Sequence, residues 1–360
     1  MQLPDSPFHA RVEQSCDFLR TTFDDTARQL AELSPDAAAA CQHVKDLALG
    51  GKHIRSLLTH VAADRPADQP TPGADISVAA AFDLLHSAFL LVDDIIDDDD
   101  IRRGRTTLHA YSRKRALEHH GINPANGSAA THYGRSVAVL AGMAAQNVTM
   151  RVVLESGAPT EVTAHLLKLF SHATGSSIAG EFMDIHHSLP DVHPTAHDIA
   201  TTNRLKTSIY SFEAPLIAGR LLAGGGMDDV AHATTLGRDL GAAYQLADDI
   251  RDVYASGEET GKATGGSDLS QKRATALISF ATTTDAWPTI EKALDQHPVD
   301  TTTIATMLRD CGALHSAQQA IDQHLHDAHT TIEKLQLSTA ATDLLHHLAD
   351  NVGRSHTTVV

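Results

Sequence analysis

The stretch LLVDDIIDDDDIRRG, residues 90–104, places six aspartates in eight positions, directly after an apolar run and directly before two arginines. The spacing of DDIID at residues 93–97 returns as DDIRD at residues 248–252. On a helix, residues i and i+4 lie one above the other, so the first and last aspartate of each motif point in the same direction. Like charges at this spacing repel one another. The repeated pattern therefore predicts that each motif binds a polyvalent cation.

Apolar helical sequence precedes each motif, FDLLHSAFLLV before the first and LGAAYQLA before the second. This predicts two helices that are buried in the core and end with their acidic residues at the mouth of a cavity. Carboxylate oxygens suit Mg²⁺, which binds through one or two carboxylates and bridges to a substrate phosphate. Two facing motifs would hold one diphosphate through several Mg²⁺ ions, whereas Asp98 to Asp100 alone also fit a solvated acidic turn. The predicted metal ligands are Asp93, Asp94, Asp97, Asp248, Asp249 and Asp252.

Basic segments complete the predicted site. Two glycines precede the cations of GGKHIR at residues 50–55 and allow a loop to approach a ligand closely. Arginine and lysine bind phosphate oxygens directly where metal does not reach. Each cation alone is more often a solvated surface charge, but together with two acidic motifs they predict two anion sites, one bridged by Mg²⁺ and one held by protein cations. The residues of these segments are Lys52, Arg55, Arg102, Arg103, Lys206, Thr207, Lys262, Lys272 and Arg273.

Composition limits the class of protein. With 360 residues and 42% hydrophobic content, the chain has enough apolar sequence for a substantial core. Its formal net charge of -17 disfavours a nucleic-acid partner, which needs a basic surface. Three widely separated cysteines without CxxC spacing indicate reduced thiols in a cytoplasmic protein. The first thirty residues lack the pattern of a secretory signal, and no uncharged apolar window of about 18 residues predicts a membrane span.

Apolar residues recur with helical periodicity along most of the chain, while alternating runs of β-branched residues bounded by hairpin turns are scarce. Glycine- and proline-rich breaks separate the helical segments without a shift in composition. The longest apolar segment, ISVAAAFDLLHSAFLLV, contains Asp83 and His86, which favours a buried helix over a membrane span. We therefore predict an all-α protein with a single domain over residues 1–360, a helical bundle around a central cavity.

With both acidic motifs and the GGKHIR loop in place, the chain resembles the trans-isoprenyl diphosphate synthase (polyprenyl synthetase) family, and within it the geranylgeranyl diphosphate synthases. The resemblance covers nearly the whole sequence and implies the isoprenoid synthase fold, a Mg²⁺ cofactor and a homodimer. It also implies that both aspartate motifs chelate Mg²⁺ on the diphosphate of an allylic substrate. The implied ligands are Lys52, Arg55, His86 and Arg103 for isopentenyl diphosphate, and Arg102, Lys206, Thr207, Gln245 and Lys262 for the allylic diphosphate, with Lys272 or Arg273 as a later phosphate ligand.

The chain departs from the family's usual pattern at several positions. His53 stands where an arginine is common, and Ser56 where a proline is common. Val92 replaces a histidine that often precedes the first motif. Glu181 of GEFMD takes the place of a usual glutamine, while Asp184 is retained. Two of these differences fall in the loop that the resemblance assigns to isopentenyl diphosphate.

The resemblance implies prenyl transfer as the reaction. An allylic diphosphate (dimethylallyl, geranyl or farnesyl) ionises while Mg²⁺, Lys206 and Lys262 stabilise the leaving pyrophosphate. The alkene of isopentenyl diphosphate attacks the allylic cation, and pyrophosphate is the expected base for the proton that is lost. An apolar tunnel keeps water away and receives the growing chain. The predicted catalytic residues are Asp93, Asp94, Asp97, Lys206, Asp248 and Lys262.

Product length should depend on the floor of this tunnel, one helical turn before the first motif. Ala88 and Phe89 stand there, and a small and a bulky residue give opposite indications. Phe89 also fits simple core packing. In the family, a first motif without a two-residue insertion goes with one type of geranylgeranyl synthase and with long-chain synthases. The expectation is a C20 product, with C15 and longer products left open.

Two other classes of function fit part of the pattern. A class I terpene cyclase usually needs aromatic rings around its cations, and the aromatic content of 4% is low. A cyclase would also replace the second DDxxD motif and lack the GGKHIR type of loop. A non-catalytic regulatory subunit of a prenyl synthase tends to lose one aspartate motif, whereas both are present here.

Overall fold

The structure is a computed structural model of the chain and describes residues 6–66, 68–119, 127–189, 192, 194–254, 269, 275–296 and 298–357. It divides into two compact units, one of Pro7–Leu167 and one of Met1–Ser6 with Lys168–Val360. α-Helices dominate both units, which confirms the predicted all-α class. A single domain over the whole chain stays a prediction.

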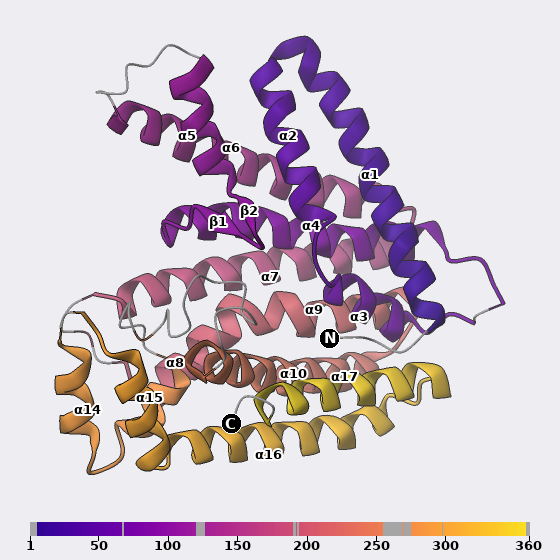
Figure 1. Ribbon diagram of the computed structural model, residues 1–360. Helices are drawn as coiled ribbons and strands as arrows, with labels where there is room; N and C mark the ends of the chain where they lie inside the picture. The colour runs from indigo at the N-terminus through magenta and orange to yellow at the C-terminus, as the bar shows by residue number, and fades with distance from the viewer. Residues whose placement is uncertain are drawn as a thin grey trace. The chain divides into compact units, whose positions relative to one another are not determined.

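The first unit is built around one long and largely buried helix, α4 (Gly73–Ile96). Helices α1, α3 and α6 pack against it, and α2 and α5 make further contacts. Because α4 has neighbours on several sides, apolar residues occur all around it, as its long apolar sequence predicts. The other helices of this unit, indigo to magenta in Figure 1, are α1 (Pro7–Leu33), α2 (Pro35–Ala48), α3 (Ile54–Ala63), α5 (Leu108–His119), α6 (Gly127–Leu154) and the first part of α7 (Thr160–His187).

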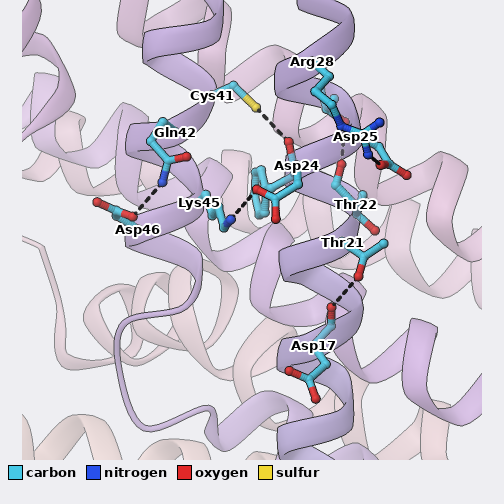
Figure 2. A network of polar contacts seen from close by, with 12 residues as sticks. Asp17, Thr21, Thr22, Asp24, Asp25, Arg28, Cys41, Gln42, Lys45 and Asp46 are labelled. Carbon is cyan, nitrogen blue, oxygen red and sulfur yellow. Dashed lines mark hydrogen bonds and ion pairs between the residues drawn. The ribbon is translucent and has the colours of Figure 1, made fainter.

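The first two helices form a hairpin with a one-residue connection. Ser34 caps α2, its Oγ accepting a hydrogen bond from the backbone N of Ala37 at 3.3 Å. Lys45 of α2 forms an ion pair with Asp24 of α1, and the Cys41 thiol lies 3.8 Å from a backbone carbonyl oxygen of α1 (Figure 2). These contacts hold the end of α2, which leads directly into the GGKHIR loop.

Helix α6 approaches its neighbours closely because it presents small residues to them. A Cβ on Gly142 would lie 3.3 Å from the Ala88 carbonyl oxygen of α4, and one on Gly134 would lie 2.3 Å from a carbonyl oxygen of α5. The opposite side of α6 carries Leu140 and Met143, which are 65% and 63% exposed. One face of α6 is therefore a close-packed interface, and the other is apolar and uncovered in the single chain.

By length and composition alone, α4 and α6 would qualify as membrane spans. The apolar window of α4 is 78% buried inside the protein, and that of α6 is 33% buried. The burial of α4 agrees with the interpretation of its sequence as a core helix. The predicted absence of a membrane span stays a prediction for the chain as a whole.

Between α4 and α5, the chain forms a small antiparallel hairpin of β1 (Ile101–Arg102) and β2 (Arg105–Thr106). These are the only strands among the described residues. The hairpin follows the acidic motif directly and contains the arginines of IRRG.

The second unit is centred on α10 (Met227–Tyr254), which packs against η2, α9, α16 and α17. Figure 1 shows α16 in amber and α17 in yellow, lying alongside each other. The unit comprises the rest of α7, α8 (Ala196–Asn203), the π-helix η2 (Arg204–Glu213), α9 (Ala214–Leu222), α13 (Ala276–Ala281), α14 (Trp287–Leu294), α15 (Thr301–Asp310), α16 (Ala313–Lys334) and α17 (Thr339–Thr357).

Candidate active site

The first acidic motif occupies the C-terminal end of α4. Asp93 and Asp94 lie in its last turn, and Asp97 is its C-cap, with a backbone N–H that donates to the Asp93 carbonyl oxygen at 2.8 Å. The C-terminal end of a helix carries a partial negative charge, so three carboxylates at this end destabilise the helix unless a cation compensates. The arrangement points to cation binding rather than to helix capping.

Arg102 supplies one such cation from within the chain. Its Nη2 donates to Asp93 Oδ2 at 2.9 Å, and its Nε donates to Asp94 Oδ1. Asp94 is 3% exposed, and burial raises the pKa of its carboxyl to about 6, although the guanidinium of Arg102 acts in the opposite direction. The structure thus places Arg102, a predicted ligand of the allylic diphosphate, on the carboxylates of the first motif.

The β1–β2 hairpin directs Arg102 and Arg103 to different partners. Arg103 and Gly104 form its two-residue turn with φ of 52° and 72°, the left-handed pair that this kind of tight hairpin requires. The Arg103 guanidinium donates to the Gly50 carbonyl oxygen and lies so close to Gly51 that a Cβ there would be 2.7 Å from Nη1. The glycine pair of GGKHIR therefore makes room for Arg103.

Several predicted diphosphate ligands lie near one another around His86 in α4. Burial in the first place, and then the positive charges of Arg55, Arg103 and Arg102, lower the pKa of His86 well below its ordinary value. His86 is therefore neutral at pH 7 and carries a single N–H beside the three guanidinium groups. Lys52 is exposed two residues before the start of α3.

A cavity of about 390 Å³ opens beside the first motif. Its lining combines the carboxylate of Asp94 with three arginines and the glycine backbone of the loop. His43 and Arg105 belong to no motif, and only folding brings them to this place. The lining residues are His43, Asp46, Leu47, Leu49, Gly50, Gly51, Leu91, Asp94, Arg102, Arg103, Arg105, Thr106, Thr107 and Leu108.

One face of α4 is half-buried above the motif, whereas the rest of the helix there is fully buried. Over residues 77–91, all of them described, the helix is buried everywhere except at His86 and Phe89. Both residues share a helix face with Asp93, because they precede it by seven and four positions. Ala88 is 3% exposed and belongs to the hydrophobic core. Of the two predicted chain-length residues, Phe89 alone lies on this half-buried face.

The second acidic motif lies near the C-terminal end of α10, and its aspartates differ in exposure. The Asp248 side chain is 54% exposed, whereas Asp249 and Asp252 are buried. Asp249 accepts hydrogen bonds on both oxygens, from Gln245 Nε2 at 3.0 Å and from the backbone N of Ala276 at 3.0 Å. Its carboxylate thus ties α10 to the start of α13. Asp248 is the most open of the predicted metal ligands in this motif.

Lys206 lies in η2 and contacts two carboxylates of α7. Its Nζ is 2.9 Å from Glu181 Oε2 and 2.6 Å from Asp184 Oδ2. The Ser177 hydroxyl, also on α7, donates to the Lys206 carbonyl oxygen at 3.0 Å. π-Helical turns are rare and occur frequently at functional sites. The GEFMD segment therefore holds Lys206, a role that motif spacing did not predict.

Glycines allow η2 to lie directly against its neighbours. A Cβ on Gly180 of α7 would lie 2.3 Å from the backbone N of Lys206, and one on Gly241 of α10 would lie 2.5 Å from a side-chain atom of η2. Gly241, Gln245 and Asp248 follow one another at i, i+4 and i+7, so they share one face of α10. The face of α10 that contacts η2 thus continues into the exposed carboxylate of the second motif.

Some predictions about the site stay predictions. Lys262, Lys272 and Arg273 lie outside the described residues. Thr207 follows Lys206 in η2. The two acidic motifs belong to different units, so their facing one another across a single cavity also stays a prediction.

The donor set fits Mg²⁺. No three histidine, cysteine, aspartate or glutamate side chains in the described part of the chain form a ready-made metal cage. Mg²⁺ does not require one, because it keeps several waters and binds through one or two carboxylates together with substrate phosphates. Asp93 and Asp94 at the end of α4, and Asp248 near the end of α10, are donors of this kind.

Comparison with known proteins agrees with this chemistry. The family model for polyprenyl synthetase matches residues 38–311, which include both acidic motifs. A geranylgeranyl diphosphate synthase from Pseudescherichia vulneris is 30% identical over 256 residues, covering 68% of this chain and 73% of that protein. An octaprenyl diphosphate synthase from Escherichia coli is 26% identical over 298 residues, covering 79% of this chain and 80% of the other.

A solved structure confirms the expected fold. The geranylgeranyl pyrophosphate synthase from Corynebacterium glutamicum, complexed with isoprenyl diphosphate and magnesium, superposes with a TM-score of 0.86 at 24% identity, over 96% of this chain and 98% of that one. Fold, motifs and family model therefore agree, and the chain belongs to the polyprenyl synthetase family.

Proposed function

We propose that the protein is a Mg²⁺-dependent trans-prenyltransferase that condenses isopentenyl diphosphate head-to-tail with an allylic diphosphate and releases geranylgeranyl diphosphate, C20. The observation that carries the proposal is the acidic end of α4 in the same unit as a cluster of guanidinium groups around a neutral histidine. The carboxylates are suited to bind Mg²⁺, and the guanidinium groups are suited to bind the phosphate oxygens. A diphosphate substrate that arrives with its metal ion needs both.

The basic cluster is suited to hold the diphosphate of isopentenyl diphosphate. Arg55 and Arg103 present charged forks to phosphate oxygens, and neutral His86 adds an N–H donor without further repulsion. Lys52 is exposed beside them and free to swing toward a phosphate. Mg²⁺, when bound at the aspartates, supplies electrostatic stabilisation of the departing pyrophosphate.

In the second unit, Lys206 is suited to bind the allylic diphosphate. Its ammonium is held by Glu181 and Asp184 on α7, and a diphosphate carries more negative charge than either carboxylate. The phosphate oxygens therefore compete for the same ammonium. Gln245 lies on the same face of α10 as Asp248, one turn before it, where its amide can donate to the same anion.

A C20 product is supported by Phe89 and by one relative. The ring stands on the half-buried face of α4, one turn before Asp93, where it would limit the space for a growing chain. The geranylgeranyl synthase at 30% identity forms a product of this length by its name, whereas the octaprenyl synthase forms a longer one. Replacing Phe89 by alanine is expected to lengthen the product.

Labelled isopentenyl diphosphate, incubated with Mg²⁺ and with dimethylallyl, geranyl or farnesyl diphosphate in turn, tests the proposal. Extension products that disappear when EDTA is added are expected, with C20 predominant by chromatography of the dephosphorylated lipids. A hydrocarbon formed from the allylic diphosphate alone would instead identify a terpene cyclase. No turnover with any primer would identify a non-catalytic subunit.

We also propose that the protein is a cytoplasmic homodimer without a membrane span. The exposed Leu140 and Met143 on α6 favour a second copy as the covering partner, because a water-exposed apolar helix face is unfavourable. Cys16, Cys41 and Cys311 are free thiols, as in a reducing compartment. Light scattering on the purified protein and fractionation of cells test the two parts.

A further inference from the structure

The loop that carries Lys52 and Arg55 is anchored by the residue between them, His53. Its backbone is left-handed, with φ of 48°, and it precedes α3 without capping the helix through its side chain. Its Nδ1 lies 2.8 Å from Asp83 Oδ2 on α4, and its Nε2 lies 3.3 Å from the Leu49 carbonyl oxygen. Nε2 also lies 3.7 Å from the Cys16 sulfur, so both ring nitrogens have their hydrogen-bond partners inside the protein.

The contact between His53 and Asp83 is a buried ion pair. The hydrogen bonds to Asp83 first and to the Cys16 thiol second raise the pKa of His53 to about 10, which keeps the imidazole charged at neutral pH. The two side chains are only 14% and 6% exposed. A charge-assisted hydrogen bond in this setting resists movement, because separating the partners leaves an uncompensated charge away from water.

The position of Asp83 on α4 places the anchored loop close to His86. Asp83 precedes His86 by three residues, so both project from the same face of the helix. The His53–Asp83 pair therefore fixes the loop within one turn of His86. At its other end, the loop is held by Arg103, which donates to the Gly50 carbonyl oxygen.

We propose that His53 is a positioning residue, whose ion pair with Asp83 holds Lys52 and Arg55 in register with His86 and Arg103 for the diphosphate of the non-allylic substrate. The inference rests on the proposed function and deepens it. His53 touches no substrate in this scheme. Its effect falls on the binding of one substrate out of two, because the loop it anchors does not carry Lys206 or either acidic motif.

Steady-state kinetics of His53→Gln and Asp83→Asn, with each substrate varied in turn, test the inference. Both variants keep hydrogen-bonding groups but lose one charge of the pair. We expect the KM for isopentenyl diphosphate to rise about tenfold, with the KM for the allylic substrate and kcat changed by less than about twofold. His53→Arg, which restores a cation able to pair with Asp83, should recover most of the affinity.

His60→Gln is the matched control. His60 is a buried histidine on α3, and its Nε2 lies 2.9 Å from the Ser15 hydroxyl, so the substitution disturbs the same helix. It should lower Tm without raising the KM for isopentenyl diphosphate. The double variant His53→Gln with Asp83→Asn removes both charges and keeps a neutral pair, so it supplies the same measurement should a single variant not fold.

The outcomes separate this inference from the proposed function. If the wild type extends an allylic primer but folded His53 and Asp83 variants raise both KM values equally, or neither, the positioning role is wrong. If His60→Gln raises the KM for isopentenyl diphosphate as much as His53→Gln does, the effect is general loosening of α3, and the inference is again wrong. A wild type without extension activity overturns the proposed function itself.

Discussion

Single aspartates of the second motif have different surroundings, which predicts different consequences of mutation. Asp248 is exposed, so Asp248→Asn should change the free energy of unfolding by less than about 0.5 kcal/mol. The substitution should lower kcat/KM by roughly a thousandfold, because it removes a proposed charged ligand for Mg²⁺. Denaturant titration and the extension assay measure the two effects on the same preparation.

Asp249→Ala is the counterpart on the neighbouring residue. It deletes the acceptor for Gln245 and for the backbone N of Ala276, at an expected cost of about 1–3 kcal/mol in stability. A variant as stable as the wild type would contradict the assigned role of Asp249 in joining α10 to α13.

The His53–Asp83 pair predicts a pH dependence of stability. An unfolded histidine has a pKa near 6.5, and the pKa in the folded protein is about 10. Because folding raises the pKa, the stabilisation is complete below about pH 6.5 and is lost as the pH rises from there through about 10.

The unfolding free energies of the wild type and of His53→Ala should therefore differ most at about pH 6 and converge toward about pH 10. Urea titrations at several pH values across this window provide the measurement. If the difference in unfolding free energy stayed constant across this pH window, the imidazole would stabilise the protein through packing and not through its charge.

Sequence patterns can predict a site residue when the residues that define its role are close to it in sequence. Asp93 and Asp248 follow from local spacing, because like charges at helical intervals have few explanations. The partner of Arg102 and the hydrogen bonds of Asp249 depend on segments that meet only after folding, Ala276 among them. No periodicity in the sequence encodes such pairings.

At the scale of elements, η2 is the feature that motif spacing does not predict. A π-helix widens the turn, and here the Lys206 carbonyl oxygen takes a hydrogen bond from Ser177 of α7. The long amphipathic and apolar helices, in contrast, are predictable because their periodicity extends over many residues. The β1–β2 hairpin is too short for any alternating pattern and rests on the turn at Arg103 and Gly104.

Gly180→Ala should disturb η2 selectively. The new methyl group would overlap the backbone N of Lys206, at an expected cost of about 1–3 kcal/mol, and it would displace the ammonium from Glu181 and Asp184. Thermal unfolding should show the loss, and the KM for the allylic diphosphate should rise.

Gly175→Ala offers a control on the same helix. A Cβ at Gly175 has no atom within 4 Å outside its own helix backbone, so alanine should be neutral or stabilising by up to about 1 kcal/mol. Equal destabilisation by the two alanines would mean that close approach to η2 is not the reason for the glycine at position 180.

At the scale of the whole molecule, the uncovered face of α6 predicts the oligomeric state. Leu140→Glu and Met143→Glu each place a charge on the proposed dimer surface, where burial without a partner is unfavourable. Both variants should elute as monomers with helical content unchanged, as measured by light scattering and circular dichroism.

Leu33→Glu provides the comparison for this surface. Leu33 is 83% exposed at the end of α1 and far in sequence from α6, so its replacement should leave the oligomeric state unchanged. A wild type that is already monomeric at micromolar concentration would refute the homodimer.

Helix α4 fixes the spacing between four residues of the proposed site, Asp83, His86, Phe89 and Asp93. Each residue of an α-helix advances the chain by about 1.5 Å along the helix axis and rotates it by about 100°. Inserting or deleting one residue between Asp83 and Asp93 would therefore rotate the acidic end of α4 by more than a quarter turn relative to the loop anchored at Asp83. Product length in this lineage should therefore change through substitutions that alter side-chain volume on α4. Active descendants should have no insertion or deletion between Asp83 and Asp93.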